Sequence, residues 1–231
     1  MEGPEMRVMV VTAHADDAEF GAAGTIASWV RQGRKVTYVV CTNGDKGSSD
    51  PAMTSERLAP IRQQEQLEAA KILGVGEVVF LDHPDGSLED TPVFRGELVR
   101  LIRKYRPDIV VTADPYRKYR WHRDHRITGT VTMDAIFPYA RDHLSYPEHI
   151  AEGLVPHKVK EAYLWASEEP DIFIDISETF SLKLAALRCH ASQVGQDFDR
   201  VKYWVEQRAS DLGREQGIPL AEAFHRVDCG Y

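Results

Sequence analysis

The stretch RVMVVTAHADDAEF, residues 7–20, places an apolar run directly before a cluster of polar and charged side chains. Its first part, Arg7–Thr12, is rich in β-branched residues, as is typical of a strand buried on both faces of a parallel sheet. His14, Asp16 and Asp17 follow at once. Because open α/β sheets bind their ligands beyond the carboxyl ends of the strands, this stretch predicts both a fold class and the position of a functional site.

Working outward, further strand-like runs alternate with segments of helical periodicity. This alternation predicts an α/β fold with a mostly parallel sheet flanked by helices, and we expect a single domain over residues 1–231. Residues 138–156 carry three prolines and predict a long loop. The remaining strands are expected at Lys35–Cys41, Glu77–Leu81, Asp108–Thr112, Val159–Ala166 and Asp171–Ile176. Helices are expected at Gly21–Gln32, Pro60–Leu73, 94–105, His125–Phe137, Glu178–His190 and Asp199–Leu212.

The composition narrows the class of protein. Apolar residues make up 43% of the 231 residues and charged residues 28%, as in ordinary soluble globular proteins. A net charge of −8 argues against a nucleic-acid or anionic-membrane partner, and we read the short basic segment Arg117–Arg120 as lining a cleft. No apolar run reaches the roughly 18 residues of a spanning helix. The three cysteines are too few for a disulfide framework or a cysteine zinc site, which favours a cytoplasmic protein.

A second polar cluster, His122-Arg123-Asp124-His125, stands where a helix is expected to begin. The spacing i, i+3 would put both imidazoles on one helix face. Asp124 would either cap that helix or orient one of the rings. A catalytic zinc site needs about three protein ligands and an open position for water, and only the two clusters together supply that number. The sequence therefore predicts a metal-dependent hydrolase.

Each cluster also has a simpler interpretation. Asp16 and Asp17 could cap a helix, since free amides and the helix dipole favour acidic residues there. Paired histidines such as His122 and His125 are often surface residues. If both aspartates serve the site, we expect them to divide the work, because neighbouring side chains on an extended backbone point in opposite directions. One carboxylate would then bind metal while the other faces the attacking water.

Several segments, taken in order along the chain, carry a resemblance to one known family. They are His14–Glu19, Thr42–Gly47, Arg62–Ala70, Leu81–Gly86, His122–His125, His190–Gln193 and Glu222–Phe224. These segments resemble the PIG-L/LmbE-like family of zinc-dependent N-deacetylases. The resemblance implies a Rossmann-like fold and the removal of an acetyl group from an N-acetylglucosamine-type sugar or a related amide.

The resemblance also implies a role for individual residues. The implied roles are metal ligation by His14, Asp17 and His125, general-base catalysis by Asp16, stabilisation of the oxyanion or protonation of the leaving amine by His122, and contact with sugar hydroxyls by Arg62 and Asp85. Two positions depart from the family pattern, because Ala15 and Arg123 stand where proline is common. Neither change removes a ligand, and Arg123 adds a charge near the site.

Several alternatives stay open. The metal could be Zn²⁺, Fe²⁺ or another divalent ion, because two histidines and a carboxylate also suit non-haem iron. The substrate could be a non-sugar amide such as a thiol conjugate. A non-catalytic, Rossmann-like sugar- or nucleotide-binding protein is disfavoured, since no Gly-x-Gly-x-x-Gly turn follows the first strand. The general acid, the number of subunits in a homo-oligomer, and whether residues 44–50 or 138–156 cover the site are not decided by the sequence.

The remaining charged and imidazole side chains are given lesser roles. Arg62 and Glu65 are one turn apart and form either a useful interior pair or a surface ion pair. We expect His190 to pack against the core without a chemical role. His143, His149 and His157 are expected to face solvent.

Overall fold

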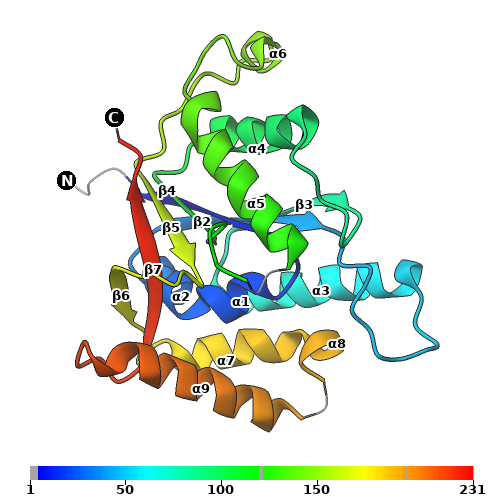
Figure 1. Ribbon diagram of the computed structural model, residues 1–231, viewed down its shortest axis with the longest axis vertical. Coiled ribbons are helices and arrows are strands. Elements are labelled where there is room, and N and C mark those ends of the chain that lie inside the picture. Colours follow the sequence, from blue (N-terminus) through cyan, green and yellow to red (C-terminus); the bar gives the residue numbers. More distant parts are fainter. Residues whose placement is uncertain (1–4, 120–121, 196, 231) are drawn as a thin grey trace.

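Seven strands form one mixed sheet in the computed structural model, whose described residues are 5–119, 122–195 and 197–230 (Figure 1). Their order across the sheet is β3-β2-β1-β4-β5-β7-β6. The pairs within β3-β2-β1-β4-β5 are parallel, while β7 runs antiparallel to both of its neighbours. The strands are β1 (Arg7–Thr12), β2 (Lys35–Thr42), β3 (Glu77–His83), β4 (Ile109–Ala113), β5 (Glu161–Trp165), β6 (Ile172–Asp175) and β7 (Ala221–Asp228).

Helices cover both faces of the sheet (Figure 1). They are α1 (Asp17–Gly21), α2 (Ala23–Arg31), α3 (Ser55–Leu73), α4 (Pro92–Tyr105), α5 (Arg123–Asp134) with its continuation η1 (Ala135–Tyr139), α6 (Pro147–Ala151), α7 (Phe180–Cys189), α8 (Ala191–Val194) and α9 (Phe198–Arg214). Alternate residues of β1 serve the two faces: Val8 and Val10 pack with α2, α3 and α7, whereas Met9 and Val11 pack with α4 and α5. The expected α/β fold with a mostly parallel sheet is thereby confirmed.

The path of the chain explains where a site can form. From β1 the chain continues to β2 on one side, and β4 lies on the other side of β1. Doubly wound sheets bind their ligands at such a reversal of direction, which here lies at the carboxyl ends of β1 and β4. The cluster that begins at His14 follows β1, and the cluster that ends at His125 follows β4. The topology therefore brings the two clusters to one edge of the sheet.

The expected elements are largely present, but four expectations were wrong. A short helix, α1, precedes α2, and α3 begins at Ser55, so that Pro60 lies inside the helix and not in its first turn. The segment expected to be a long loop, residues 138–156, contains α6 and the end of η1. The strand β7 was not predicted at all, although it lies between β5 and β6.

The strand β7 is fastened by a buried charge. Glu222 accepts hydrogen bonds from the backbone N–H groups of Gly24 (3.0 Å) and Thr25 (2.7 Å) at the start of α2. Its carboxylate also accepts from Lys183 of α7 at 2.6 Å. Because Glu222 and Lys183 are only 4% and 3% exposed, this pair links three elements through the interior.

Two further observations complete the fold. No helix among the described residues is both long and apolar enough to cross a bilayer. Cys41, Cys189 and Cys229 are all free thiols.

Candidate active site

The loop between β1 and α1 turns sharply at Asp16. This residue has φ of 95°, the left-handed conformation that non-glycine residues seldom adopt, and it stands at the N-cap position of α1. Its side chain makes no capping hydrogen bond, so the helix-cap interpretation does not describe Asp16. Asp17 begins the helix, and its Oδ2 accepts from the backbone N–H of His14 at 2.9 Å.

The turn at Asp16 sends the two neighbouring carboxylates in different directions. Asp17 faces the histidines, with Oδ1 3.0 Å from Nε2 of His125. Asp16 faces Arg62, whose Nη2 lies 3.7 Å from its Oδ1. The two aspartates therefore diverge as expected, but the cause is a left-handed turn followed by a helix start, not an extended backbone.

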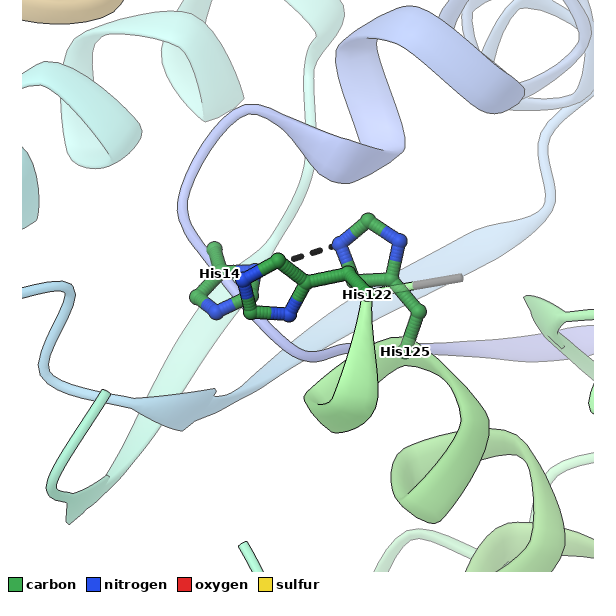
Figure 2. A group of neighbouring side chains, drawn as sticks. All are labelled: His14, His122 and His125. Carbon is green, nitrogen blue, oxygen red and sulfur yellow. Dashed lines mark hydrogen bonds between the residues drawn. The ribbon is translucent and has the colours of Figure 1, made fainter. Parts of the chain in front are cut away.

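The start of α5 presents the two remaining histidines (Figure 2). His122 caps the helix, and its Nδ1 accepts from the backbone N–H of Asp124 at 3.3 Å. His125 lies one turn further along, with the ring centroids 5.0 Å apart, so the i, i+3 spacing does place both rings on one face. The ring of His14 lies 4.6 Å from that of His122 and 5.2 Å from that of His125.

Three donor atoms converge from the two clusters. Nδ1 of His14 is 3.2 Å from Nε2 of His125, a contact drawn as a dashed line in Figure 2. Asp17 closes the triangle, with Oδ1 3.0 Å from Nε2 of His125 and Oδ2 3.6 Å from Nδ1 of His14. Tetrahedral zinc with bonds of about 2.0–2.1 Å separates its ligand atoms by about 3.3 Å. The donor types and their spacing therefore fit a divalent metal ion held by two histidines and one aspartate.

A second choice of third ligand is also close at hand. Ring nitrogens of His14, His122 and His125 lie within 4.8 Å of one another. His122 is exposed, whereas Asp17 is largely buried and hydrogen-bonded into the loop. The geometry of the described residues thus gives two candidate sets that share His14 and His125, and a third in which His14 is grouped with Asp85 and Asp124.

Two buried carboxylates orient the ring of His14. Its Nε2 lies 3.0 Å from Oδ1 of Asp85 and 3.3 Å from Oδ2 of Asp124. Asp124 is fully buried and is itself fixed by the backbone N–H groups of Gly86 (2.6 Å) and Leu88 (3.2 Å). With Nε2–H committed to carboxylates, Nδ1 is the atom that faces the donor cluster. Of the two roles expected for Asp124, orientation of a ring describes its contacts.

The charges in this cluster favour bound cations. Burial lowers the pKa of His14, but Asp124, Asp17 and Asp85 outweigh it and raise that pKa to about 12. Burial likewise opposes the ionised form of Asp17, yet His125 and His14 hold its pKa well below the usual range. For His125, burial lowers the pKa and the Asp17 carboxylate more than reverses this, so the pKa is raised. Without a metal ion, His14 and His125 are therefore favoured in their protonated forms, and a bound cation would replace that positive charge.

Asp16 and His122 have shifts of the opposite kind. Burial and the charge of Asp17 raise the pKa of Asp16 to about 7, although Arg62 and other cations oppose the shift. Although His122 is exposed as a residue, partial desolvation of its ring, together with His14 and His125, lowers its pKa. Near neutral pH, one group is thus a carboxyl poised to exchange a proton and the other is a neutral imidazole.

Arg62 is buried and hydrogen-bonds to backbone carbonyl groups, so it does not form a surface ion pair. It is 4% exposed, and its Nη2 donates to the carbonyl oxygen of Ala15 at 2.7 Å. Its Nη1 donates to the carbonyl oxygen of Lys46 at 3.2 Å and lies 3.7 Å from Oδ2 of Asp85. Glu65 does not pair with Arg62 but accepts two hydrogen bonds from Ser192. Arg62 therefore ties the site loop to the loop that follows β2.

The contacts of Asp85 differ from those of a free sugar-binding group. Asp85 is 5% exposed, and its two oxygens face His14 and Arg62. Its backbone N–H donates to Asp45 at 3.2 Å, which holds the start of the loop 44–50 near the site. The later residues of that loop, 46–50, are exposed.

Three further histidines lie outside the site, and two of them, His149 and His157, are less exposed than expected. His83 lies 2.7 Å from Glu97, apart from the donor cluster. His149 is 4% exposed and stacks on Tyr146, so the expectation that it faces solvent was wrong. His157 is also partly buried, and its Nε2 donates to the carbonyl oxygen of Pro107 at 2.7 Å.

Residues 138–156 and the basic segment Arg117–Arg120 were both considered in the sequence as possible neighbours of the site. Helix α6 lies beyond the far end of α5 from His122 (Figure 1), so residues 138–156 do not cover the site in this chain. In the basic segment Arg117 is half-buried and Lys118 is exposed, while Arg120 lies outside the described residues.

One residue at the site was not recognised in the sequence. Gln66 is fully buried on α3, and its Oε1 accepts from the backbone N–H of Asp16 at 3.2 Å. The signal available in the sequence was its position one turn beyond Arg62 on the same helix, which is weak for an uncharged side chain.

The chain is similar in sequence to a family model and to individual proteins. Residues 9–136, more than half of the chain, match the family model PIG-L, described as GlcNAc-PI de-N-acetylase. A diacetylchitobiose deacetylase from Thermococcus kodakarensis is 35% identical, over 96% of this chain and 83% of its own length. A mycothiol S-conjugate amidase from Streptomyces coelicolor is 38% identical, over 97% of this chain and 80% of its own length.

Solved structures share the fold of this chain. The N,N'-diacetylchitobiose deacetylase from Pyrococcus horikoshii superposes with a TM-score of 0.93 at 29% identity, covering 97% of this chain and 85% of its own. A 4-carboxy-2-hydroxymuconate hydratase from Pseudomonas putida gives 0.81 at 25% identity, covering 96% of each chain. The same fold thus carries more than one reaction, and function has to be argued from the site.

Proposed function

The chain belongs to the PIG-L family, and from this premise we propose that it is a metal-dependent N-deacetylase. It hydrolyses the acetamide of an N-acetylglucosamine-type sugar or glycoside, releasing acetate and leaving the amine on the sugar. The observation that carries the proposal is the convergence of His14, Asp17 and His125, with a separate carboxylate, Asp16, directly beside them.

We assign metal ligation to Nδ1 of His14, Nε2 of His125 and the Asp17 carboxylate, with Zn²⁺ as the ion. When bound, such an ion supplies a water of lowered pKa and an electrophile that polarises the amide carbonyl. Asp85 and Asp124 serve the ligands indirectly, because they hold Nε2–H of His14 and so keep Nδ1 turned towards the ion's place.

Asp16 is the general base. Its backbone is held by Gln66 and its carboxylate lies near Arg62, beside the metal ligands but not among the three donor atoms. A carboxyl with a pKa raised to about 7 by burial and by Asp17 can accept a proton from the attacking water and then return it. Returning it to the departing nitrogen would let Asp16 serve as general acid as well.

His122 stabilises the developing oxyanion. The backbone N–H of Asp124 donates to its Nδ1, so the neutral ring carries its proton on Nε2. Since partial desolvation and the neighbouring histidines lower the pKa of His122, the neutral form prevails and Nε2–H is a hydrogen-bond donor. A fixed donor of this kind aids the transition state without itself giving up a proton.

Arg62 acts on substrate mainly through the loops that it joins. Its guanidinium is occupied by the carbonyl oxygens of Ala15 and Lys46, and Asp85 is occupied by His14. We therefore propose that Arg62 and Asp85 shape the rim on which the sugar hydroxyls rest. Nε of Arg62 is buried without a hydrogen-bond partner in the described part of the chain, so it is not open to a sugar hydroxyl.

The test is a screen for acetate release. Purified protein is depleted of metal with a chelator, reloaded with Zn²⁺ or Fe²⁺, and assayed on N-acetylglucosamine, N,N'-diacetylchitobiose and other N-acetylated glycosides. The proposal predicts acetate from at least one sugar, no activity after chelation, and recovery on reloading. Metal-loaded protein that releases no acetate from any of these sugars would reject it.

The 38% identity to an S-conjugate amidase favours one second candidate, hydrolysis of a thiol-conjugate amide by the same residues. The assay separates the two, because the amide of such a conjugate yields a product other than acetate. A preference for the conjugate, with no turnover of N-acetylated sugars, would establish the second candidate. Binding of a sugar without turnover of any amide would instead indicate a non-catalytic protein.

A further inference from the structure

A chain of buried polar side chains runs behind Asp16, away from the metal ligands. Gln66 accepts from the backbone N–H of Asp16 and donates through Nε2 to Oε1 of Glu19 at 3.0 Å. The other oxygen of Glu19 lies 3.3 Å from Nε2 of His190. Gln66, Glu19 and His190 are each 0% exposed. Burying a carboxylate and an imidazole away from solvent is unfavourable unless they are paired, and Glu19 and His190 are ion-pair partners within this buried chain.

The segment that carries His190 touches the site region at a second place. Ser192, in α8, donates its N–H and its hydroxyl to Glu65 of α3 at 2.8 Å and 2.6 Å. Glu65 and Gln66 are adjacent on α3, so the segment His190–Gln193 and Asp16 both contact this turn of α3. This accounts for a motif that the proposed reaction leaves without a role.

Asp16 needs such support because of its backbone. Its φ of 95° is strained for a residue with a Cβ, and such conformations persist only where surrounding contacts determine them. Two contacts hold the turn from the α3 side, namely Gln66 at the Asp16 N–H and Arg62 at the Ala15 carbonyl. Among the described residues, the amide nitrogen of Gln66 donates its hydrogen bond to Glu19, and this contact fixes the orientation of the Gln66 side chain.

We infer that His190 and Glu19 are positioning residues for the reaction: acting through Gln66, they hold the strained turn that aims the Asp16 carboxylate. The inference rests on the proposed role of Asp16 as general base. The polar side-chain contacts of Glu19 and His190 among the described residues are with Gln66 and with each other, and not with the donor atoms of the metal ligands. We therefore expect their effect to fall on kcat and to leave KM and metal content unchanged.

The experiment compares matched variants of buried residues. His190→Leu and Gln66→Met remove the polar contacts with little change of volume, whereas His190→Gln keeps a donor near the position of Nε2. His149→Leu is the control, because His149 is also a buried histidine, 4% exposed, but lies in α6. For each variant kcat, KM, zinc content and the hydrogen exchange rate of the Asp16 amide are measured, the last on the metal-free protein.

We expect kcat to fall on the order of 10-fold or more in His190→Leu and Gln66→Met, and to stay within about 3-fold of the parent in His190→Gln and His149→Leu. In an Asp16→Asn background, the first two substitutions should cause no further loss, because the group they aim is gone. Additive losses in that background would overturn the inference.

Hydrogen exchange gives a readout that does not depend on activity. Exchange at the Asp16 amide should accelerate in both Gln66→Met and His190→Leu and remain at the parental rate in His149→Leu. If the protein deacetylates no sugar, the proposed function fails while this result still tests the chain of contacts. An Asp16 amide that exchanges at the parental rate in His190→Leu would overturn the positioning role.

Discussion

Replacing Asp16 by asparagine should remove activity and at the same time make the metal-free protein more stable at alkaline pH. The side chain keeps its shape, but it can no longer accept a proton. We expect kcat to fall on the order of 10²–10⁴-fold with zinc content unchanged, since the carboxylate is proposed to transfer a proton and not to bind metal. The stabilisation follows from the environment that raises the pKa of Asp16.

The magnitude follows from linkage between folding and protonation. Folding raises the pKa of Asp16 from an ordinary value of 3.8 to about 7, chiefly through burial and the charge of Asp17. The ionised form is therefore disfavoured in the folded state, so this group lowers stability progressively as pH rises from 3.8 to about 7, with no further loss above that. The full effect is about 4 kcal/mol, of which about 3 kcal/mol develops between roughly pH 5 and pH 8. The Asp16→Asn variant escapes this loss, because its amide does not titrate.

The assay is urea unfolding of metal-free parent and Asp16→Asn at roughly pH 5 and pH 8. The stability gap in favour of the variant should widen by about 3 kcal/mol at the higher pH. Asp199→Asn, a change of the same kind at an exposed position, should show no comparable widening. A gap that is the same at both pH values would refute the reasoning, because Asp16 would then not be a carboxyl that titrates near neutrality.

Other perturbations test the remaining parts of the site and the fold. His125→Ala should lose both zinc and activity, as elemental analysis and acetate release would show; stoichiometric zinc in that variant would contradict its role as a ligand. His122→Ala should keep near-stoichiometric zinc while kcat falls, whereas loss of the metal would make His122 a ligand. Zinc affinity should rise about tenfold or more per pH unit between roughly pH 6 and pH 8, because His14 must release a proton to bind metal. Its carboxylate partners outweigh burial and raise the pKa of His14 to about 12. Competition with a chelator measures the affinity, and an affinity that does not change with pH would contradict the prediction. Lys183→Met should lower the free energy of unfolding by about 3–5 kcal/mol, because it leaves the Glu222 carboxylate buried without its cation; a loss below about 1 kcal/mol in urea unfolding would show that the pair matters little.

The central part of the fold could be predicted because its strands are buried on both faces. In β1 and β4 almost every residue is buried, which leaves continuous apolar runs that are visible in the sequence. β7 lacks that signature: its second half alternates between partly buried and exposed positions and carries His225, Arg226 and Asp228. Its place in the sheet depends on Glu222, whose partners lie far away in the chain, and no local pattern reports them.

The predicted helix boundaries were wrong where tertiary contacts outweigh the local preference of the sequence. Pro60 is well suited to a first turn, yet α3 begins at Ser55 because Leu58 is 2% exposed and packs inside the protein. Helix α1 was missed because its first residues belong to the polar cluster: Asp16 and Asp17 were considered as helix caps, but the helix itself was expected to begin only at Gly21.

At the site, the sequence was informative about residue types and uninformative about their mutual orientation. The pairing of His14 with His125 depends on β4 lying next to β1, and the alternation of elements predicted the parallel sheet but not the order of its strands. The use of Asp124 and Asp85 against one ring nitrogen of His14 depends on the exact course of the turn after β3. The burial of Arg62 depends in the same way on carbonyl groups of two loops.

The most direct test of the central claim is anomalous scattering at the zinc absorption edge from crystals of the zinc-loaded protein. We expect one strong peak with His14 Nδ1, His125 Nε2 and an Asp17 oxygen each about 2.0–2.2 Å away. An ion held by His122 in place of Asp17, or a peak elsewhere with these three side chains unoccupied, would contradict the assignment.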